Sequence, residues 1–319
     1  MQDIVAVILA AGRGTRMQPF SEDYPKPGLP ICNKPLIQYT IETFRELGIR
    51  DIFIVIGHLG HELVQMFGRG DALGVRLKYV EQTQLLGIAA ALGQMESHIS
   101  SPMFLVLGDI FFKTDDLSSM IEMMQANQAS AILAVKHELD PAAIRRNFTV
   151  RRQADGRVVR VVEKPRYVDT TLKGCGLYLF DLPVFDAVRR TPRTAMRDEY
   201  EITDTIQIMI DDGLAVYAAE VVQWDVNLTA PADVLICNMY QLRSLGREVL
   251  IGEHAQVHVG ATLKHVVVGE RATIRHPIAL TNCVIFPDTD VTLTTDVDKF
   301  ILTPEHQIDC RPFITGESI

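Results

Sequence analysis

The stretch Val5–Pro35 reads VAVILAAGRGTRMQPFSEDYPKPGLPICNKP. It opens with Val5–Leu9, a wholly apolar run that is typical of a strand buried on both faces. Small residues dominate the next positions, Ala10–Gly14. They let a loop approach a ligand closely and direct backbone N–H groups at phosphate oxygens. The stretch therefore predicts a buried strand that ends in an anion-binding loop.

Three cations accompany this loop. Arg13, Arg16 and Lys26 supply positive charge of the kind that holds a triphosphate. Lys26 lies between two prolines, which restrict the backbone on either side and present its ammonium group from a stiff segment. The loop is not a P-loop, because no Lys-Ser or Lys-Thr pair follows the glycines. It is not a GxGxxG dinucleotide fingerprint either, because Met17 stands at the third glycine position.

Length and composition bound the class of protein. The chain has 319 residues, of which 47% are hydrophobic and 22% charged, as in an ordinary two-domain globular protein. A net charge of -9 argues against a generic nucleic-acid binder. No apolar run approaches ~20 residues and no signal peptide is recognisable, so we expect no membrane partner. Five scattered cysteines without a CxxC pair indicate reduced thiols in a cytoplasmic protein, and neither a disulfide framework nor a zinc site.

Apolar runs alternate with helical patterns through the first half of the chain. Ile52–Ile56 has the composition of a second buried strand, and Phe104–Leu107 is another apolar strand. Strands are also expected at Val75–Val80 and Ala131–Val135. A helix is expected with Asn33 as its cap, Pro35 in its first turn and Gly48 as its end. Further helices are expected at 61–67, 88–95 and 116–126, and from Thr203 to Gly213. This alternation predicts an α/β fold with a Rossmann-like, mostly parallel sheet flanked by helices. Ligands on such sheets bind at the carboxyl ends of strands, where Gly12–Arg16 and Asp109 both fall.

The pattern changes after Val150. Asp155-Gly156 is a hairpin turn signal, and the strand after it leads into Glu163–Pro165. Further strands are expected at Gly174–Phe180 and Val216–Val222, and a long helix at Ala230–Leu245. In the tail, apolar residues recur near multiples of six, which predicts a few coils of a β-helix. We therefore expect one domain at residues 1–229, a connecting helix at 230–249 and a β-helix-like tail at 250–319.

Two strings carry a resemblance to a known family. AAGRGTRM (residues 10–17), followed by YPKPGLPICNKPLI (residues 24–37), closely resembles the signature of the sugar-phosphate nucleotidylyltransferases, the enzymes that make nucleotide sugars. The tail resembles the left-handed β-helix found on some members. The resemblance implies that residues 1–229 are a catalytic domain that converts an NTP and a sugar 1-phosphate into an NDP-sugar and pyrophosphate. The favoured substrates are dTTP or UTP with glucose 1-phosphate.

The resemblance also implies roles for individual residues. The catalytic residues would be Arg16, Lys26 and Lys164. The nucleotide would contact Leu9, Ala11, Gly12, Gly14, Thr15, Arg16, Gln82 and Gly87. The sugar phosphate would contact Glu163, Lys164, Gly174 and Glu199, with Glu201 close by in sequence. A glutamine amide both donates and accepts hydrogen bonds, which gives Gln82 a physical basis for reading a pyrimidine edge.

Two aspartates match the family's metal ligands, Asp109 in LGDIFF and Asp225 in QWDVN. Mg²⁺ prefers hard oxygen ligands and usually takes one or two carboxylates together with substrate phosphates. The resemblance therefore implies one Mg²⁺ shared by Asp109 and Asp225. Each aspartate follows an apolar run, so we expect both carboxylates at one edge of the sheet, and we expect either Asp→Asn variant to fold.

The chain departs from the family in two places. Many relatives have Phe-Gly or Tyr-Gly before the hairpin, where the sugar approaches the backbone, whereas this chain has Asn147-Phe148-Thr149. The base-reading segment after Gly87 reads IAAA, where relatives usually have a Thr or a second Gly. Both departures bear on substrate specificity, and neither touches the predicted phosphate-binding or metal-binding residues.

Three alternatives stay open. GTP with mannose 1-phosphate is a second substrate pair within the same class. A catalytically silent, regulatory relative is disfavoured because the five matched cationic and acidic residues are all present. An acyltransferase tail would draw its base from His254, His258, His265 or His276, but the tail has few coils to form a cleft. An open β-edge on so short a tail also leads us to expect a homo-oligomer.

Overall fold

A computed structural model describes residues 3–195 and 198–314 of the chain. The chain divides into two compact units. The first combines Met1–Gly12 with Thr40–Asp225, and the second combines Arg13–Tyr39 with Val226–Ile319. The predicted domain boundaries did not anticipate this division, because the segment Arg13–Tyr39 groups with the C-terminal part of the chain.

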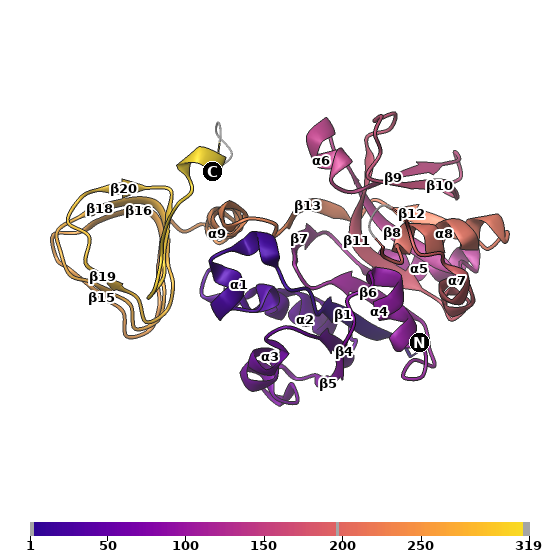
Figure 1. Cartoon of the computed structure of the whole chain (residues 1–319), viewed down its shortest axis with the longest axis horizontal. Coiled ribbons are helices and arrows are strands. Elements are labelled where there is room, and N and C mark those ends of the chain that lie inside the picture. Colours follow the sequence, from indigo (N-terminus) through magenta and orange to yellow (C-terminus); the bar gives the residue numbers. More distant parts are fainter. Residues whose placement is uncertain (1–2, 196–197, 315–319) are drawn as a thin grey trace. The chain divides into compact units, whose positions relative to one another are not determined.

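The first unit contains a nine-stranded sheet. Its parallel part has the order β6-β1-β4-β5, formed by Met103–Leu107, Val5–Ala10, Asp51–Ile56 and Arg76–Glu81. All three pairings in this part are parallel and in continuous register, with Ile8 opposite both Ile54 and Val106. Helices flank the sheet, which confirms the predicted α/β class (Figure 1). The carboxyl ends of these strands share one edge, where the loop after β1 begins.

Antiparallel strands extend the sheet beyond β6. β11 (Leu172–Phe180) pairs with β6, β8 (Ala131–His137) and β9 (Phe148–Arg152), and β9 forms the predicted hairpin with β10 (Val158–Glu163). The single strand predicted at 216–222 is two strands. β12 (Val216–Ala219) joins β8, and β13 (Val222–Asn227) pairs with the unpredicted β7 (Ile110–Thr114). A tight turn, in which Val221 N–H donates to Ala219 C=O (3.0 Å), separates β12 from β13.

The helices of the first unit follow the expected order with two additions. They are α3 (Gly60–Phe67), α4 (Ile88–Gln94), α5 (Ser118–Asn127), α6 (Pro141–Arg145), α7 (Val184–Arg190) and α8 (Ile202–Asp211). α2 (Leu36–Glu46) runs across the boundary between the units. The short helices α6 and α7 were not predicted; α6 begins where the Asp140 carboxylate accepts from the N–H groups of Ala142 and Ala143. Within the described residues, every helix is too short or too polar to cross a membrane.

The C-terminal part of the second unit is a stack of parallel coils (Figure 1). One face is formed by β14 (Val249–Ile251), β16 (Thr262–Val268), β18 (Ala279–Ile285) and β21 (Phe300–Leu302). Another is formed by β15 (Gln256–Val257), β17 (Thr273–Ile274) and β19 (Asp290–Val291). β20 (Val297–Asp298) also pairs with β18, and β22 (Gln307–Asp309) turns back antiparallel to β21. The parallel strands agree with the predicted β-helix-like tail.

The repeat of these coils differs from the hexapeptide expectation. Val249 lies opposite Val266, and Val266 lies opposite Cys283, so each coil adds 17 residues and not a multiple of six. The corners recur with the same step, because His265, Asn282 and Lys299 all have positive φ values of 53°, 48° and 60°. Apolar residues recur with this step as well, at Val257, Ile274 and Val291, so the repeat is one residue shorter than three hexapeptides.

The segment Arg13–Tyr39 is anchored within the second unit. It contains α1 (Phe20–Asp23) and a two-residue hairpin between β2 (Pro30–Ile31) and β3 (Lys34–Pro35). Cys32 and Asn33 form the turn with φ values of 48° and 62°, as a twisted hairpin requires. The prediction that Asn33 caps α2 was therefore wrong. Its side-chain amide instead donates to Val268 C=O (2.8 Å) in the coils.

Two other contacts complete this anchorage. Phe286 of the coils is fully buried, stacks on Phe20 (ring centroids 5.3 Å apart) and meets Tyr24 edge-on (5.5 Å). α9 (Pro231–Ser244) presents the buried Asn238 to the β2–β3 hairpin. The aromatic and amide contacts together fix the segment that follows the predicted phosphate loop.

Candidate active site

The loop after β1 is held by two close backbone approaches in the first unit. Gly108 N–H donates to Leu9 C=O (2.8 Å), and a Cβ at Gly108 would lie 2.9 Å from that same oxygen. A Cβ at Gly57 would lie 2.6 Å from Ala11 C=O, so only glycine fits there. Gly12, in contrast, has open space around its Cα. The backbone at Leu9 and Ala11 is thus fixed, and the predicted ligand-facing position at Gly12 is exposed.

The rest of the loop belongs to the second unit. Gly14 adopts a left-handed conformation (φ 66°), and Met17 N–H closes the turn on Gly14 C=O (2.7 Å). The aliphatic part of the Lys26 side chain lies across Gly14, where a Cβ would be 2.9 Å from Cε. The structure therefore brings the loop glycine and Lys26 together, while Thr15 and Arg16 are exposed in the short helix Thr15–Met17.

Lys164 stands at the end of β10 in an unusual backbone conformation. Its φ is 42°, which is uncommon for a residue with a side chain and costs energy that functional sites often tolerate. Its N–H donates to Asn147 C=O (2.9 Å), which fixes the position. Its ammonium group lies 3.9 Å from the Glu163 carboxylate, and the side chain is 40% exposed. Lys164 is therefore a positioned and accessible cation.

The predicted base-reading and sugar-contacting segments are neighbours. Tyr200 N–H donates to Leu86 C=O (2.7 Å), and a Cβ at Gly87 would lie 2.5 Å from Tyr200 C=O. Glu199 is half-buried beside this contact. Gln82 is buried, and its side-chain amide donates to Gln84 C=O (3.0 Å), which orients the amide group. Gly87 thus serves a close backbone approach that places the two segments side by side.

Gly174 has a different environment from the one expected for a sugar-pocket floor. A Cβ at this position would fall inside the Phe148 ring. Phe148 is itself buried and stacks on Tyr178 at a centroid distance of 6.0 Å. Gly174 therefore makes room for the Phe148 ring. The contact of Gly174 with a sugar stays a prediction.

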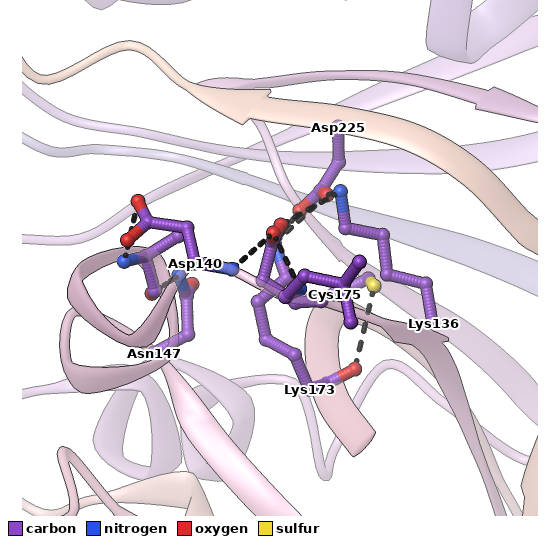
Figure 2. Close-up of polar contacts among 9 residues, drawn as sticks. Lys136, Asp140, Asn147, Lys173, Cys175 and Asp225 are labelled. Carbon is purple, nitrogen blue, oxygen red and sulfur yellow. Dashed lines mark hydrogen bonds and ion pairs between the residues drawn. The ribbon is translucent and has the colours of Figure 1, made fainter. Parts of the chain in front are cut away.

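Asp225 lies at the centre of a buried ionic cluster (Figure 2). The Lys173 ammonium group donates to Oδ1 (2.8 Å) and Oδ2 (2.7 Å), and the Lys136 ammonium group lies 2.9 Å from Oδ1. The side chains of Asp225, Lys173 and Lys136 are only 2%, 4% and 13% exposed. Glu138 lies 3.2 Å from Lys136 and balances the remaining charge.

Burial and charge compete in this cluster. Burial alone would lower the pKa of Lys136, but its contacts with Asp225 and Glu138 outweigh burial and raise that pKa. Burial also opposes ionisation of Glu138, yet its hydrogen bonds, including that to Lys136, lower its pKa. Burial raises the pKa of the neighbouring Cys175 thiol, so this cysteine stays protonated. The cluster therefore pairs two ammonium groups with two carboxylates.

This environment does not fit a metal ligand at Asp225. Three of about four acceptor positions on its carboxylate are taken by ammonium groups. Among the described residues, no group of three or more His, Cys, Asp or Glu side chains is arranged to hold a metal ion. Asp225 lies on β13, and Asp109 lies in the turn immediately before β7, the partner strand of β13. The predicted role of Asp225 as a ligand of a shared Mg²⁺ therefore does not fit its surroundings.

The sequence interpretation missed Lys136 and Lys173. A signal was present, because Lys173 is the only charged residue in the otherwise apolar strand β11. A buried charge in such a strand requires a partner. Arg16 and Lys26 belong to the second unit, whereas Lys164 and both aspartates belong to the first.

Comparison with known proteins places this site in context. Residues 5–226 match the model of a family described as nucleotidyl transferase. A low-salt glycan biosynthesis nucleotidyltransferase of Haloferax volcanii is 32% identical over 256 residues, covering 79% of this chain and 70% of the relative. A glucose-1-phosphate thymidylyltransferase of Streptomyces antibioticus is 30% identical over 274 residues, covering 84% and 74%. The solved structure of a UDP-glucose pyrophosphorylase shares the fold, with a TM-score of 0.68, 24% identity and coverage of 76% and 100%.

Proposed function

Because the chain belongs to the nucleotidyl transferase family, we propose that it joins an NTP to a sugar 1-phosphate. A phosphate oxygen of the sugar attacks the α-phosphorus, the bond from that phosphorus to the bridging oxygen breaks, and pyrophosphate leaves. The substrates we favour are dTTP or UTP with glucose 1-phosphate, since relatives are named for glucose-1-phosphate thymidylyl and uridylyl transfer. GTP with mannose 1-phosphate is the alternative pair.

The observation that carries this proposal is the packing of Lys26 on the loop glycine Gly14. It places a cation beside backbone N–H groups in a loop of small residues, which is suited to a triphosphate. In-line transfer depends mainly on positioning and charge neutralisation, and needs no covalent intermediate. We assign Arg16 and the loop amides to the β- and γ-phosphates, Lys26 to the α-phosphate, and Lys164 to the sugar phosphate.

Mg²⁺ is proposed to enter with the nucleotide, whose phosphates supply most of its ligands. Of the two predicted metal aspartates, Asp109 is the one that this proposal retains. We also propose a cytoplasmic location, because all five cysteines are free and buried, as expected in a reducing compartment. A homo-oligomer is proposed from exposed apolar side chains on the coils, such as Val259 (98% exposed).

The decisive experiment measures pyrophosphate release from the full chain across a grid of dTTP, UTP, GTP and ATP with several sugar 1-phosphates. Turnover with dTTP or UTP and glucose 1-phosphate, above the other combinations, supports the proposal. Preference for GTP with mannose 1-phosphate replaces the favoured substrates by the alternative pair. Absence of turnover in every combination, from a chain that is folded by circular dichroism, supports the silent regulatory relative.

A further inference from the structure

We propose that Asp225 is a counter-ion for two buried lysines and not a metal ligand. Its carboxylate on β13 holds the ammonium groups of Lys136 on β8 and Lys173 on β11 in place. The inference rests on the proposed function only for its metal-binding experiment. The stability experiments below are independent of any substrate.

The contacts distinguish a counter-ion from a metal ligand. Lys173 donates to both carboxylate oxygens of Asp225 at 2.7 and 2.8 Å, and Lys136 approaches Oδ1 at 2.9 Å. Such short charge-assisted contacts to a carboxylate with 2% exposure leave little access for another ligand. A Mg²⁺ ion bound at ~2.1 Å from the same oxygens would lie next to two ammonium groups. Their repulsion with the ion would be strong in this buried setting.

The cluster also has a mechanical role. Lys136 lies on β8, Lys173 on β11 and Asp225 on β13. The contacts of one carboxylate therefore link three strands. β11 and β8 are antiparallel neighbours with Lys173 opposite Lys136, which places two like charges side by side. Without Asp225 these two ammonium groups would repel each other in a buried position. The carboxylate is what makes this pairing of strands possible.

The first experiment compares the thermal unfolding of Asp225→Asn and Asp51→Asn in the full chain. Asp51 is a matched control, because it also contacts two cations, Arg76 and Lys78, but its side chain is 31% exposed. Asp225→Asn removes the carboxylate that Lys173 and Lys136 share and leaves Glu138 as the anion beside Lys136, so we expect its Tm to fall by about 10 °C. Asp51→Asn should change Tm by less than about 2 °C. Equal Tm values for Asp225→Asn and the parent would overturn the proposal.

A second variant tests whether the loss comes from the unpaired charges. Lys173→Met removes one buried ammonium group while keeping an aliphatic chain of similar length. In the Asp225→Asn background it should restore Tm by several degrees, whereas alone it should lower Tm, because the Asp225 carboxylate loses a partner. Additive losses in the double variant would mean that the two residues do not act together, and would contradict the proposal.

The third experiment measures Mn²⁺ binding by electron paramagnetic resonance, with Mn²⁺ alone and with Mn²⁺ plus dTTP. The main variant is the double variant Lys173→Met/Asp225→Asn, chosen because it should remain folded. Asp109→Asn is measured for comparison, because Asp109 is the metal aspartate that the proposed function retains. We expect the Mn²⁺ dissociation constant of the double variant to stay within threefold of the parent. A tenfold weakening in the double variant, with Tm close to the parent's, would overturn the proposal.

The outcomes separate this inference from the proposed function. A parent chain that binds neither Mn²⁺ nor dTTP would contradict the proposed function, while the two Tm comparisons would still decide the role of Asp225. A parent that binds both, with an Asp225→Asn variant of unchanged Tm and weakened Mn²⁺ affinity, would support the function and reject the counter-ion.

Discussion

Replacing Asn238 by alanine should loosen the segment that follows the phosphate loop. The Asn238 side chain is fully buried, and its Oδ1 accepts from Cys32 N–H (2.7 Å) while its Nδ2 donates to Pro30 C=O (3.0 Å). Asn238→Ala removes the side-chain partner of both backbone groups, of which the Cys32 group is buried. Each such group costs roughly 1–3 kcal/mol, so the free energy of unfolding should fall by roughly 2–6 kcal/mol.

Two measurements check this expectation. Urea unfolding followed by circular dichroism gives the change in free energy, and hydrogen exchange of the Cys32 amide reports the local contact directly. Asn238 also donates to the carbonyl four residues earlier, that of Val234 (2.9 Å). Asn127→Ala is the matched control, because Asn127 makes the same kind of bond to Met123 C=O (2.9 Å) but is exposed. We expect less than ~0.5 kcal/mol for this control. Equal losses in both variants, with unchanged exchange at Cys32, would refute the anchorage of the hairpin by α9.

Three further predictions concern the loop, the β-sheet and the surface. Arg16→Ala and Lys26→Ala should keep the parent's Tm but lose ~10²–10³-fold in turnover of pyrophosphate release, and activity within a few-fold of the parent in both would contradict the loop assignment. Gly174→Ala should lower the free energy of urea unfolding by about 1–3 kcal/mol, because the added methyl group clashes with the Phe148 ring. Adding Phe148→Leu to this variant should recover part of the loss. An unchanged free energy of unfolding in Gly174→Ala would contradict the close packing. The hydrogen bond from Arg76 lowers the pKa of Asp51. The small Tm advantage of the parent over Asp51→Asn should therefore be present above about pH 4 and vanish as pH falls through the lowered pKa. A Tm advantage that persists at pH 2 would contradict this expectation.

The central strands of the parallel part of the sheet were predictable because they are buried on both faces, whereas the edge strand β5 exposes alternate residues. Such strands must be apolar throughout, so Val5–Leu9 and Ile52–Ile56 stand out from the sequence alone. The short strand β7 was missed because its partner, β13, is more than a hundred residues away in the sequence. Local composition carries no information about so distant a pairing.

The candidate site was predictable where local chemistry decides it. Glycine tolerates the positive φ found at Gly14, and prolines restrict the backbone on both sides of Lys26. The environment of Asp225 was not predictable, because the family resemblance assigns a role to the aspartate without stating what surrounds it. Lys136 and Lys173 reach it from two other strands, and this arrangement depends on the tertiary fold. Asn33 was assigned to a helix cap for a similar reason, since its true partner, Val268, is 235 residues away.

The grouping of Arg13–Tyr39 with the C-terminal coils has a consequence for how this protein can change during evolution. A recombination event that exchanged only the C-terminal coils for those of another β-helix would remove Phe286 and the Val268 carbonyl, which Phe20 and Asn33 require. The N-terminal segment would then lose its packing surface although none of its own codons had changed. The coils therefore cannot be exchanged as an independent module at the domain boundary that the sequence suggests. Substitutions near residue 30 and in the coils should be correlated among related sequences.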